Sequence, residues 1–338
     1  MRIDDNFYMK LAIDEAWKYQ LLTYPNPAVG CVVVNNGEPL AIEAHKSAGE
    51  SHAEVNALKA AYLKKNPNSP LKAISDPFKI HEFLKENHNG FFRDCTVYVT
   101  LEPCAHIGKT PSCATLLCEL KPSKVIIAHE DMNKEASGGA QRLKEAQIEV
   151  SIGCMKKEAY ELLYPFIKWC EGNFTFFKMA QTLNGTIDGG RISSNQAQAY
   201  VHTLRDKLDL LAIGGNTVRT DQPTLDARYV AGRAPNVLIY SRNKVFDKKI
   251  PLFYIPNREV IISDNIEDIK QYKLVMIEGG YSLLNELQDV VDYFIMIVSP
   301  TMKSGFNGVE GLDINFDIIH ENYIGSDKII YLKKKTSF

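Results

Sequence analysis

Two short segments of the chain carry histidine and cysteine side chains, which are of the types that can bind zinc. HAEVNAL contains His52, and TLEPCAHIGKTPSC, residues 100–113, contains Cys104 and Cys113. Zinc takes nitrogen and sulfur ligands in tetrahedral geometry, and a catalytic zinc has three protein ligands and one position open to water. His52, Cys104 and Cys113 provide three such ligands, so the sequence predicts one zinc site that performs chemistry.

Glu54 supplies the second part of that chemistry. It follows His52 by two residues, close enough to reach a metal-bound water without binding the metal. A carboxylate in that position takes a proton from the water and passes it to a leaving amine. A purely structural zinc with four ligands is the main alternative, and it has no need of an adjacent carboxylate.

Zinc-dependent nucleobase deaminases use the pattern H-x-E followed by P-C-x-x-C. The chain has H-A-E at residues 52–54 and P-C at residues 103–104, but the next cysteine, Cys113, follows after eight residues instead of two. The pattern therefore predicts a deaminase with a long loop between two of its ligands.

The elements that position these residues alternate between strands and helices. Apolar, β-branched runs at 28–34, 95–101 and 123–130 have the length of strands, and helical patterns cover 5–22 and 112–120. Such alternation predicts an α/β domain with at least some parallel pairing. Helix starts at both clusters would favour ionised thiols and metal binding.

The segment 64–94 interrupts this alternation. It contains three prolines, many polar residues and one helix-like stretch at 79–87. We interpret it as an inserted excursion outside the core.

The second half of the chain repeats the alternation after a helical stretch. Strands are expected at 174–183 and 208–215 and a helix at 194–207, and there is no G-x-G-x-x-G dinucleotide motif. Instead, AIGGNTV and MIEGGYSLL each place a diglycine between a strand and a helix-like stretch. That arrangement exposes helix N-terminal amides to a phosphate, although a tight turn explains a diglycine equally well.

The bulk composition excludes several classes of protein. The 338 residues are 45% hydrophobic and 24% charged, with a net charge of −2, so no overall field favours nucleic acid or an anionic membrane. No apolar run is long enough to span a bilayer, and the N-terminal segment lacks the apolar core of a signal peptide. Seven cysteines, an odd number, favour a reduced compartment. We expect a cytoplasmic protein that binds neither membrane nor nucleic acid.

Longer motifs resemble one particular family. YPNPAVGCVVV, HAEVNAL and TLEPCAHIGKTPSC, in this order, resemble the deaminase domain of the bifunctional riboflavin-biosynthesis deaminase/reductase family, whose longer loop accounts for the spacing of the cysteines. KMAQTLNGTIDG, LRDKLDLLAIGGNTVRTDQPTLDAR and IEGGYSLLNEL resemble the reductase domain of the same family. Together these motifs span most of residues 1–300.

The resemblance implies the fold and the domains. It implies an α/β protein with an N-terminal cytidine-deaminase-like three-layer domain at 1–153. A connecting helix at 154–171 would lead to a C-terminal dihydrofolate-reductase-like α/β domain at 172–338.

The resemblance also implies two consecutive steps of riboflavin biosynthesis. The first is the zinc-dependent hydrolytic deamination of a diaminopyrimidinone that carries a phosphoribosylamino group. The second is the NADPH-dependent reduction of the ribosyl chain to ribityl. The implied cofactors are one Zn²⁺ per chain and NADPH, the substrates are small phosphoribosyl-pyrimidines, and the expected assembly is a homo-oligomer.

Individual residues match the family's functional positions. The metal ligands would be His52, Cys104 and Cys113, with Glu54 as the catalytic proton shuttle. The deaminase substrate positions are Asn26, His45, His106, Lys109 and Asp131. The reductase substrate positions are Lys178, Arg205, Leu225, Arg228 and Glu278. The cofactor positions are Ala180, Thr217, Asp221, Ser241, Gly280, Tyr281, Ser282, Leu283, Leu284, Asn285 and Glu286.

One departure from the family pattern keeps alternatives open. The loop after Asn184 is several residues shorter than in the family, and Asn184 stands where aspartate is usual. These differences allow a second domain that only assembles or binds. A deaminase that edits nucleic acid would instead need a basic stripe with aromatic side chains, and a non-enzymatic zinc module would tolerate replacement of Glu54.

Overall fold

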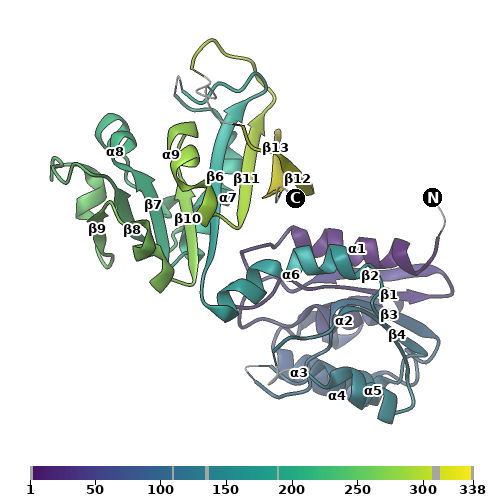
Figure 1. Cartoon of the computed structure of the whole chain (residues 1–338). Helices are drawn as coiled ribbons and strands as arrows, with labels where there is room; N and C mark the ends of the chain where they lie inside the picture. Colours follow the sequence, from purple (N-terminus) through teal and green to yellow (C-terminus); the bar gives the residue numbers. More distant parts are fainter. Residues whose placement is uncertain (1–2, 109, 134–136, 189, 307–312, 336–338) are drawn as a thin grey trace. The chain divides into compact units, whose positions relative to one another are not determined.

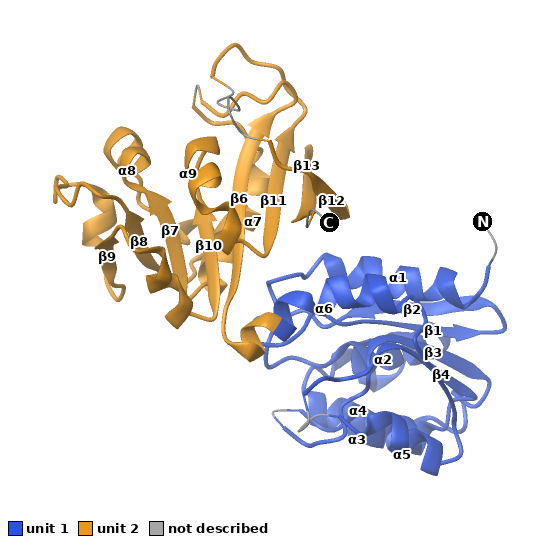
Figure 2. Ribbon diagram, in the orientation of Figure 1, with its two compact units in different colours: residues 1–167 blue, residues 168–338 orange. Residues whose placement is uncertain are grey.

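Two β-sheets, one in each half of the chain, form the framework of the protein (Figure 1). The computed structural model describes residues 3–108, 110–133, 137–188, 190–306 and 313–335. The chain divides into two compact units, residues 1–167 and 168–338 (Figure 2), and helix α6 (Lys156–Glu171) runs across the division. The domain bounds expected from the sequence stay a prediction.

The sheet of the first unit has the strand order β2-β1-β3-β4-β5. β1 pairs antiparallel with β2 and β3, whereas β3, β4 and β5 are parallel, so the predicted parallel pairing is confirmed. The turn from β1 to β2 uses Asn36 and Gly37, both with positive φ, as a tight hairpin turn requires. The strands are β1 (Gly30–Asn35), β2 (Glu38–Ala44), β3 (Cys95–Leu101), β4 (Lys124–His129) and β5 (Glu149–Ile152).

Helices cover both faces of this sheet (Figure 1). On one face α1 (Asp5–Trp17) packs on β1 and β3, and the rings of Tyr8 and Tyr98 lie 5.1 Å apart. Gly30 permits this close packing, because a Cβ there would lie 1.9 Å from the carbonyl oxygen of Ala12. On the other face the core joins the strands to α2 (Ala53–Lys65), α4 (Cys113–Leu120) and α5 (Gly139–Glu145). The predicted three-layer arrangement is confirmed.

The segment 64–94 is part of the core, so its interpretation as an excursion outside the core is wrong. It forms a 3-10 turn (Pro70–Ala73) and helix α3 (Pro77–Asn87). Proline at the first position of a helix starts the helix instead of breaking it, and several apolar residues of the segment are buried, although Phe78 is exposed. The buried ones, each at most 2% exposed and in the same cluster as α2 and α4, are Leu71, Ile80, Leu84 and Phe92.

The sheet of the second unit has the order β12-β13-β11-β6-β10-β7-β8-β9. The strands from β11 to β9 are parallel, and β13 and β12 continue the sheet in antiparallel fashion. These strands are β6 (Phe174–Thr182), β7 (Leu210–Gly214), β8 (Asn236–Tyr240), β9 (Val260–Ser263), β10 (Leu274–Glu278), β11 (Tyr293–Ser299), β12 (Phe316–Ile324) and β13 (Asp327–Lys334).

The helices of the second unit begin where parallel strands end. The carboxyl ends of parallel strands are the usual place for ligands in such sheets. α7 (Asn195–Lys207) follows β6, α8 (Gly215–Asp221) begins directly after Gly214, and α9 (Tyr281–Leu287) begins after Gly279 and Gly280. Both diglycines therefore lie between a strand and a helix, as predicted.

Among the described residues, no helix combines the length and the apolar character that a membrane crossing needs.

Candidate active sites

The three predicted zinc ligands come together at two helix starts. His52 precedes the first residue of α2, Cys113 is the first residue of α4, and Cys104 follows β3. The Nδ1 atom of His52 lies 3.6 Å from Sγ of Cys104 and 3.4 Å from Sγ of Cys113. Zinc bonds of about 2.3 Å to sulfur and about 2.0 Å to nitrogen separate tetrahedral ligands by roughly 3.5 Å. The donor types and distances therefore fit a zinc ion.

The loop between the two cysteines is closed by hydrogen bonds. The carbonyl oxygen of Cys104 accepts from the amide of Ala114 at 3.1 Å and from the hydroxyl of Ser112 at 2.8 Å. The amide of Cys113 also donates to Sγ of Cys104 at 3.3 Å. The eight intervening residues thus leave both thiols side by side.

The pKa values of the two thiols are shifted in opposite directions. The hydrogen bond from Cys113 and the adjacent His52 lower the pKa of Cys104 to about 4, whereas the same hydrogen bond and burial raise the pKa of Cys113. Cys104 is therefore a thiolate at neutral pH, which is the form that binds metals.

Thr110 orients the histidine of the cluster. Its Oγ1 lies 3.1 Å from Nε2 of His52, so Nε2 is engaged and Nδ1 faces the two thiols. Metal-binding histidines generally hold their second nitrogen in this way. The sequence analysis did not assign Thr110, although its place between the two cysteines was a usable signal.

Glu54 lies beside the cluster in the first turn of α2 and is 4% exposed. Burial raises the pKa of Glu54 to about 7. A carboxyl group with such a pKa both accepts and releases a proton readily at neutral pH. Its placement suits a proton shuttle next to the metal position.

Asn26 and His45 border the same cluster. Nδ2 of Asn26 lies 3.0 Å from Nε2 of His45, and Nδ1 of His45 donates to the carbonyl oxygen of Ser51 at 3.1 Å. Burial lowers the pKa of His45 to about 4, so the ring is neutral at pH 7. The rings of His45 and His52 lie 5.5 Å apart, which places both predicted substrate residues next to the metal ligands.

The remaining deaminase positions lie on the loops around Cys104. His106 is exposed, Lys109 lies outside the described residues, and Asp131 is half-buried with a pKa raised mainly by burial. The loop of Asp131 is held by Glu102, whose carboxylate accepts from the amides of Asp131 at 3.1 Å, Gly138 at 3.1 Å and Ala140 at 2.9 Å. Glu102 was also missed, although it is the acid in the T-L-E-P-C motif.

Three predicted reductase residues form one buried charge cluster. Lys178 on β6 is directly opposite Glu278 on β10 in the register, and Nζ lies 3.9 Å from the carboxylate. Arg205 on α7 binds the same carboxylate with contacts of 2.9, 3.0 and 3.2 Å. Although burial opposes ionisation, Arg205 and Lys178 hold the pKa of Glu278 at about 2. Glu278 is therefore ionised at neutral pH and lies between two basic side chains.

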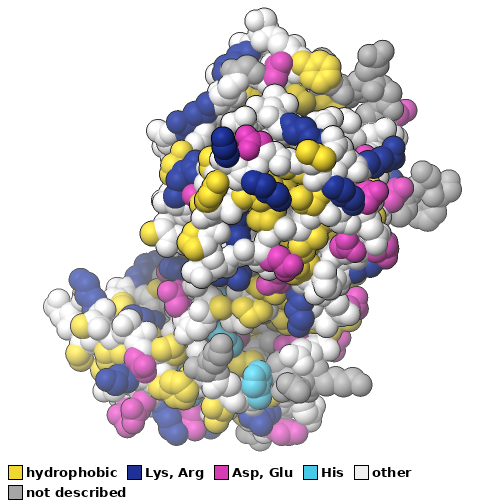
Figure 3. Space-filling view, turned by 90° about the vertical axis from the view of Figure 1, so that its left-hand side faces the viewer, with side chains coloured by type: hydrophobic (Ala, Val, Ile, Leu, Met, Phe, Trp, Pro, Cys, Tyr) yellow, Lys and Arg dark blue, Asp and Glu magenta, His cyan; other side chains and the backbone are white. Residues whose placement is uncertain are grey.

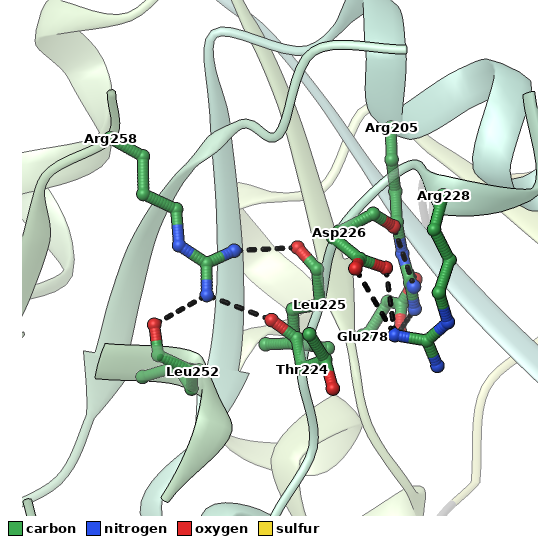
Figure 4. A network of polar contacts seen from close by, with 8 residues as sticks. All are labelled: Arg205, Thr224, Leu225, Asp226, Arg228, Leu252, Arg258 and Glu278. Carbon is green, nitrogen blue, oxygen red and sulfur yellow. Dashed lines mark hydrogen bonds and ion pairs between the residues drawn. The ribbon is translucent and has the colours of Figure 1, made fainter. Parts of the chain in front are cut away.

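Asp226 links this cluster to the remaining predicted substrate residues (Figure 4). Its backbone carbonyl accepts from Nη1 of Arg205 at 3.3 Å, and its carboxylate accepts from Arg228 at 2.9 and 3.1 Å. Leu225, the residue before it, is buried with φ of +54°. Asp226 was not assigned from the sequence, because its role depends on backbone geometry and not on a motif.

Most predicted cofactor residues gather at the carboxyl ends of β6, β7, β8 and β10. A Cβ added at Gly214 would lie 3.7 Å from Leu283 and 3.9 Å from Thr217, and one at Gly215 would lie 2.5 Å from Ser241. The hydroxyl of Tyr281 donates to Gln181, next to Ala180, at 2.6 Å, and Tyr240 donates to Glu286 at 3.3 Å. Asp221 is exposed at the end of α8, and the described contacts do not connect it to this group.

The first unit has the metal cluster and layers of a deaminase, and the second is an α/β unit with a separate charged site. The family model for the cytidine and deoxycytidylate deaminase zinc-binding region matches residues 2–129, and the model for the RibD C-terminal domain matches residues 174–308.

Full-length relatives extend this match. The chain is 32% identical over 312 residues to the riboflavin biosynthesis protein RibD of Aquifex aeolicus, which covers 87% of this chain and 79% of that protein. It is 32% identical over 281 residues to RibD of Buchnera aphidicola, covering 81% and 68%. The crystal structure of the deaminase/reductase of Thermotoga maritima is 26% identical and covers 98% of this chain and 99% of that chain, with a TM-score of 0.66.

The chain therefore belongs to the RibD family of riboflavin biosynthesis proteins. It is a bifunctional enzyme with a zinc-binding deaminase unit and a reductase unit, which carry out a deamination and then a reduction in riboflavin biosynthesis. The α/β fold class and the bifunctional activity predicted from the sequence are confirmed.

Proposed function

We propose that the first unit deaminates a diaminopyrimidinone that carries a phosphoribosylamino group, and that the second unit reduces the ribosyl chain of the product with NADPH. The observation that carries the proposal is the cluster of His52, Cys104 and Cys113 with Glu54 buried beside it. The name of the Thermotoga maritima structure, a diaminohydroxyphosphoribosylaminopyrimidine deaminase and 5-amino-6-(5-phosphoribosylamino)uracil reductase, supports this choice of substrates.

His52, Cys104 and Cys113 would hold one zinc ion. Bound there, zinc supplies a water that loses a proton near neutral pH. Glu54 would accept a proton from the attacking water while the water oxygen bonds to the ring carbon that bears the amine. Glu54 then returns a proton to the amine nitrogen, the carbon–nitrogen bond breaks, ammonia leaves and the ring carbon keeps the oxygen.

Asn26, His45, His106, Lys109 and Asp131 would bind the substrate of this first step. Neutral His45 and the amide of Asn26 suit hydrogen bonds to a pyrimidine ring, which carries both donors and acceptors. Lys109 follows Gly108 in the loop between the thiol ligands, and a lysine there suits a phosphate dianion.

In the second unit, Arg205 and Arg228 would bind the phosphate of the substrate. Guanidinium groups bind phosphate through two parallel hydrogen bonds. The rest of the substrate-binding site would be formed by Lys178, Leu225 and Glu278. NADPH would occupy the carboxyl ends of the parallel strands, against Ala180, Thr217, Asp221, Ser241 and the segment 280–286, and would deliver hydride to C1′ of the opened sugar.

We further propose that the enzyme works in the cytoplasm as a homo-oligomer on small phosphoribosyl-pyrimidines, without nucleic acid. The net charge of −2 provides no overall attraction to a polyanion such as nucleic acid. On the face in Figure 3 the coloured lysine and arginine side chains alternate with aspartate and glutamate. Sedimentation velocity of the purified protein tests the oligomer directly.

The decisive test combines metal analysis with a two-step assay on the phosphoribosylated diaminopyrimidinone. We expect one zinc per chain, release of ammonia, and then oxidation of NADPH measured at the nicotinamide absorbance band. Absence of NADPH oxidation with the deaminated substrate would contradict the cofactor assignment.

Two cysteine variants make the test specific. Cys104→Ser should lose zinc and ammonia release while it still oxidises NADPH with the deaminated substrate. Cys118→Ser is the matched control, because Cys118 lies on α4 outside the cluster and its thiol contacts the carbonyl of Arg142 at 3.6 Å. It should retain zinc and both activities.

A further inference from the structure

The described hydrogen bonds of the Arg258 side chain all go to backbone carbonyls. It lies two residues before β9, and its guanidinium donates to the carbonyl oxygens of Leu225 at 2.7 Å, Thr224 at 2.8 Å and Leu252 at 2.6 Å. Its Nε is buried and has no partner among the described residues. The group is therefore half-buried without a hydrogen-bonded carboxylate in the described part of the chain.

The backbone that Arg258 holds has an uncommon conformation. Leu225 has φ of +54°, a left-handed region that residues with a branched side chain enter only when their surroundings fix them. The two carbonyls that flank the Cα of Leu225, those of Thr224 and of Leu225 itself, both accept hydrogen bonds from Arg258. Charge-assisted hydrogen bonds to carbonyls are stronger than neutral ones, so Arg258 stabilises this left-handed turn.

The same turn also contacts the two arginines that are proposed to bind the substrate. Immediately after Leu225, Asp226 accepts from Arg205 through its carbonyl and from Arg228 through its carboxylate. Figure 4 shows Arg258 on one side of the segment 224–226 and both other arginines on the opposite side. A shift of this segment therefore moves Arg205 and Arg228 relative to each other.

We propose that Arg258 is a positioning residue of the reductase, which fixes the segment 224–226 and thereby the spacing of Arg205 and Arg228. The proposal rests on the proposed function, in which this arginine pair binds the substrate phosphate. Arg258 itself contacts neither the phosphate nor the cofactor in this arrangement. Replacement of Arg258 should therefore lower the affinity of the reductase for its phosphorylated substrate.

The test is steady-state kinetics of the reductase step in Arg258→Met, at saturating NADPH and with varied deaminated substrate. We expect KM to rise roughly tenfold and kcat to fall much less, because misplaced binding groups weaken substrate binding before they affect the reacting atoms. Arg258→Lys should give an intermediate KM, since one ammonium group cannot span three carbonyls as a planar guanidinium does. Ammonia release by the first unit should be unchanged.

Arg233→Met is the matched control. Arg233 also donates to a backbone carbonyl, that of Leu208 at 2.8 Å, but this contact lies at the residue that follows α7 and not at the segment 224–226. It should lower thermal stability without changing KM. A substrate that lacks the phosphate should show the same KM with the wild-type protein and Arg258→Met.

An unchanged KM in folded Arg258→Met, with kcat reduced only in proportion to the folded fraction, would overturn the proposal. If Arg258→Met does not fold, an unchanged KM in Arg258→Lys overturns it in the same way. Arg228→Met separates this failure from that of the proposed function. An unchanged KM in Arg228→Met contradicts phosphate binding by the pair, whereas a raised KM there and an unchanged KM in the Arg258 variants contradicts only the role of Arg258.

Discussion

Glu54 lies two residues after His52, and this spacing suits the different roles proposed for the two side chains. His52 precedes the first turn of α2 and presents Nδ1 to the thiols, while Glu54, already inside that turn, is buried next to them. The described group of possible metal ligands contains His52, Cys104 and Cys113 but not Glu54, which agrees with the proposed role of Glu54 as a proton shuttle.

Replacing Glu54 by glutamine should keep the shape of the site and remove proton transfer. We expect ammonia release to fall by about a hundredfold or more, with zinc content and NADPH oxidation on the deaminated substrate unchanged. Metal analysis and ammonia assays on the same preparation measure both. Loss of zinc together with activity would show that Glu54 is a ligand.

Glu278 makes the stability of the second unit depend on pH. Its pKa falls from 4.5 to about 2 on folding, so the native state binds fewer protons than the unfolded state between these values. The stabilisation is complete above pH 4.5 and disappears as the pH falls through about 2; it amounts to roughly 3 kcal/mol at most. Urea unfolding of the wild-type protein and Glu278→Gln should differ most near pH 6 and least near pH 2.

Asn184 explains one departure from the family pattern. Its amide donates to the carbonyl oxygen of Lys303 at 2.8 Å and to Thr186 at 3.2 Å, and its oxygen accepts from the amide of Lys303 at 3.1 Å. Aspartate has no donor for the Lys303 carbonyl. The shorter loop thus uses a residue that can donate and accept at once.

At the scale of elements, helix α3 supports the loop that carries the metal ligands. Nε2 of His81 lies 3.2 Å from the carbonyl oxygen of Ser112, to which it donates. Ser112 in turn binds the carbonyl of Cys104 and begins the helix whose first residue is Cys113. The segment 64–94 therefore contacts the loop between the two thiols.

His81→Ala should weaken metal retention without loss of the fold. We expect zinc to be removed by a chelator roughly ten times faster, in the range seen when outer partners of metal ligands are lost. His88→Ala is the control, because His88 at the end of α3 contacts Gly90 and not Ser112. Equal rates of zinc loss in both variants would contradict this role of α3.

Local patterns predicted the elements that flank the motifs, and the strand expected at 95–101 is found as Cys95–Leu101. The same reasoning failed at 64–94, where proline and polar residues separate four buried side chains, three on two short helices and Phe92 in the turn before β3. It also gave no strands beyond residue 300, because β12 and β13 depend on pairing across the sheet. Zinc ligands have recognisable types and spacing, whereas the side chains of His81 and Arg258 bind backbone carbonyls and leave no such pattern.

At the scale of the whole molecule, each unit has its own sheet, and each candidate site is built from one unit alone. The metal cluster and Glu54 belong to residues 1–167, and the charged cluster around Glu278 belongs to residues 168–338. A ligand that binds only the folded state stabilises the unit that holds it. Zinc should therefore act on the first unit and leave the second unchanged.

Removal of zinc by a chelator should abolish ammonia release and leave NADPH oxidation on the deaminated substrate at its original rate. In calorimetry we expect one unfolding transition to move to lower temperature while the other stays in place. Zinc at a hundred times its dissociation constant stabilises its unit by about 2.7 kcal/mol, so the shift should reverse when zinc is restored. A reductase rate that falls in step with zinc loss would show that the two units depend on each other for stability.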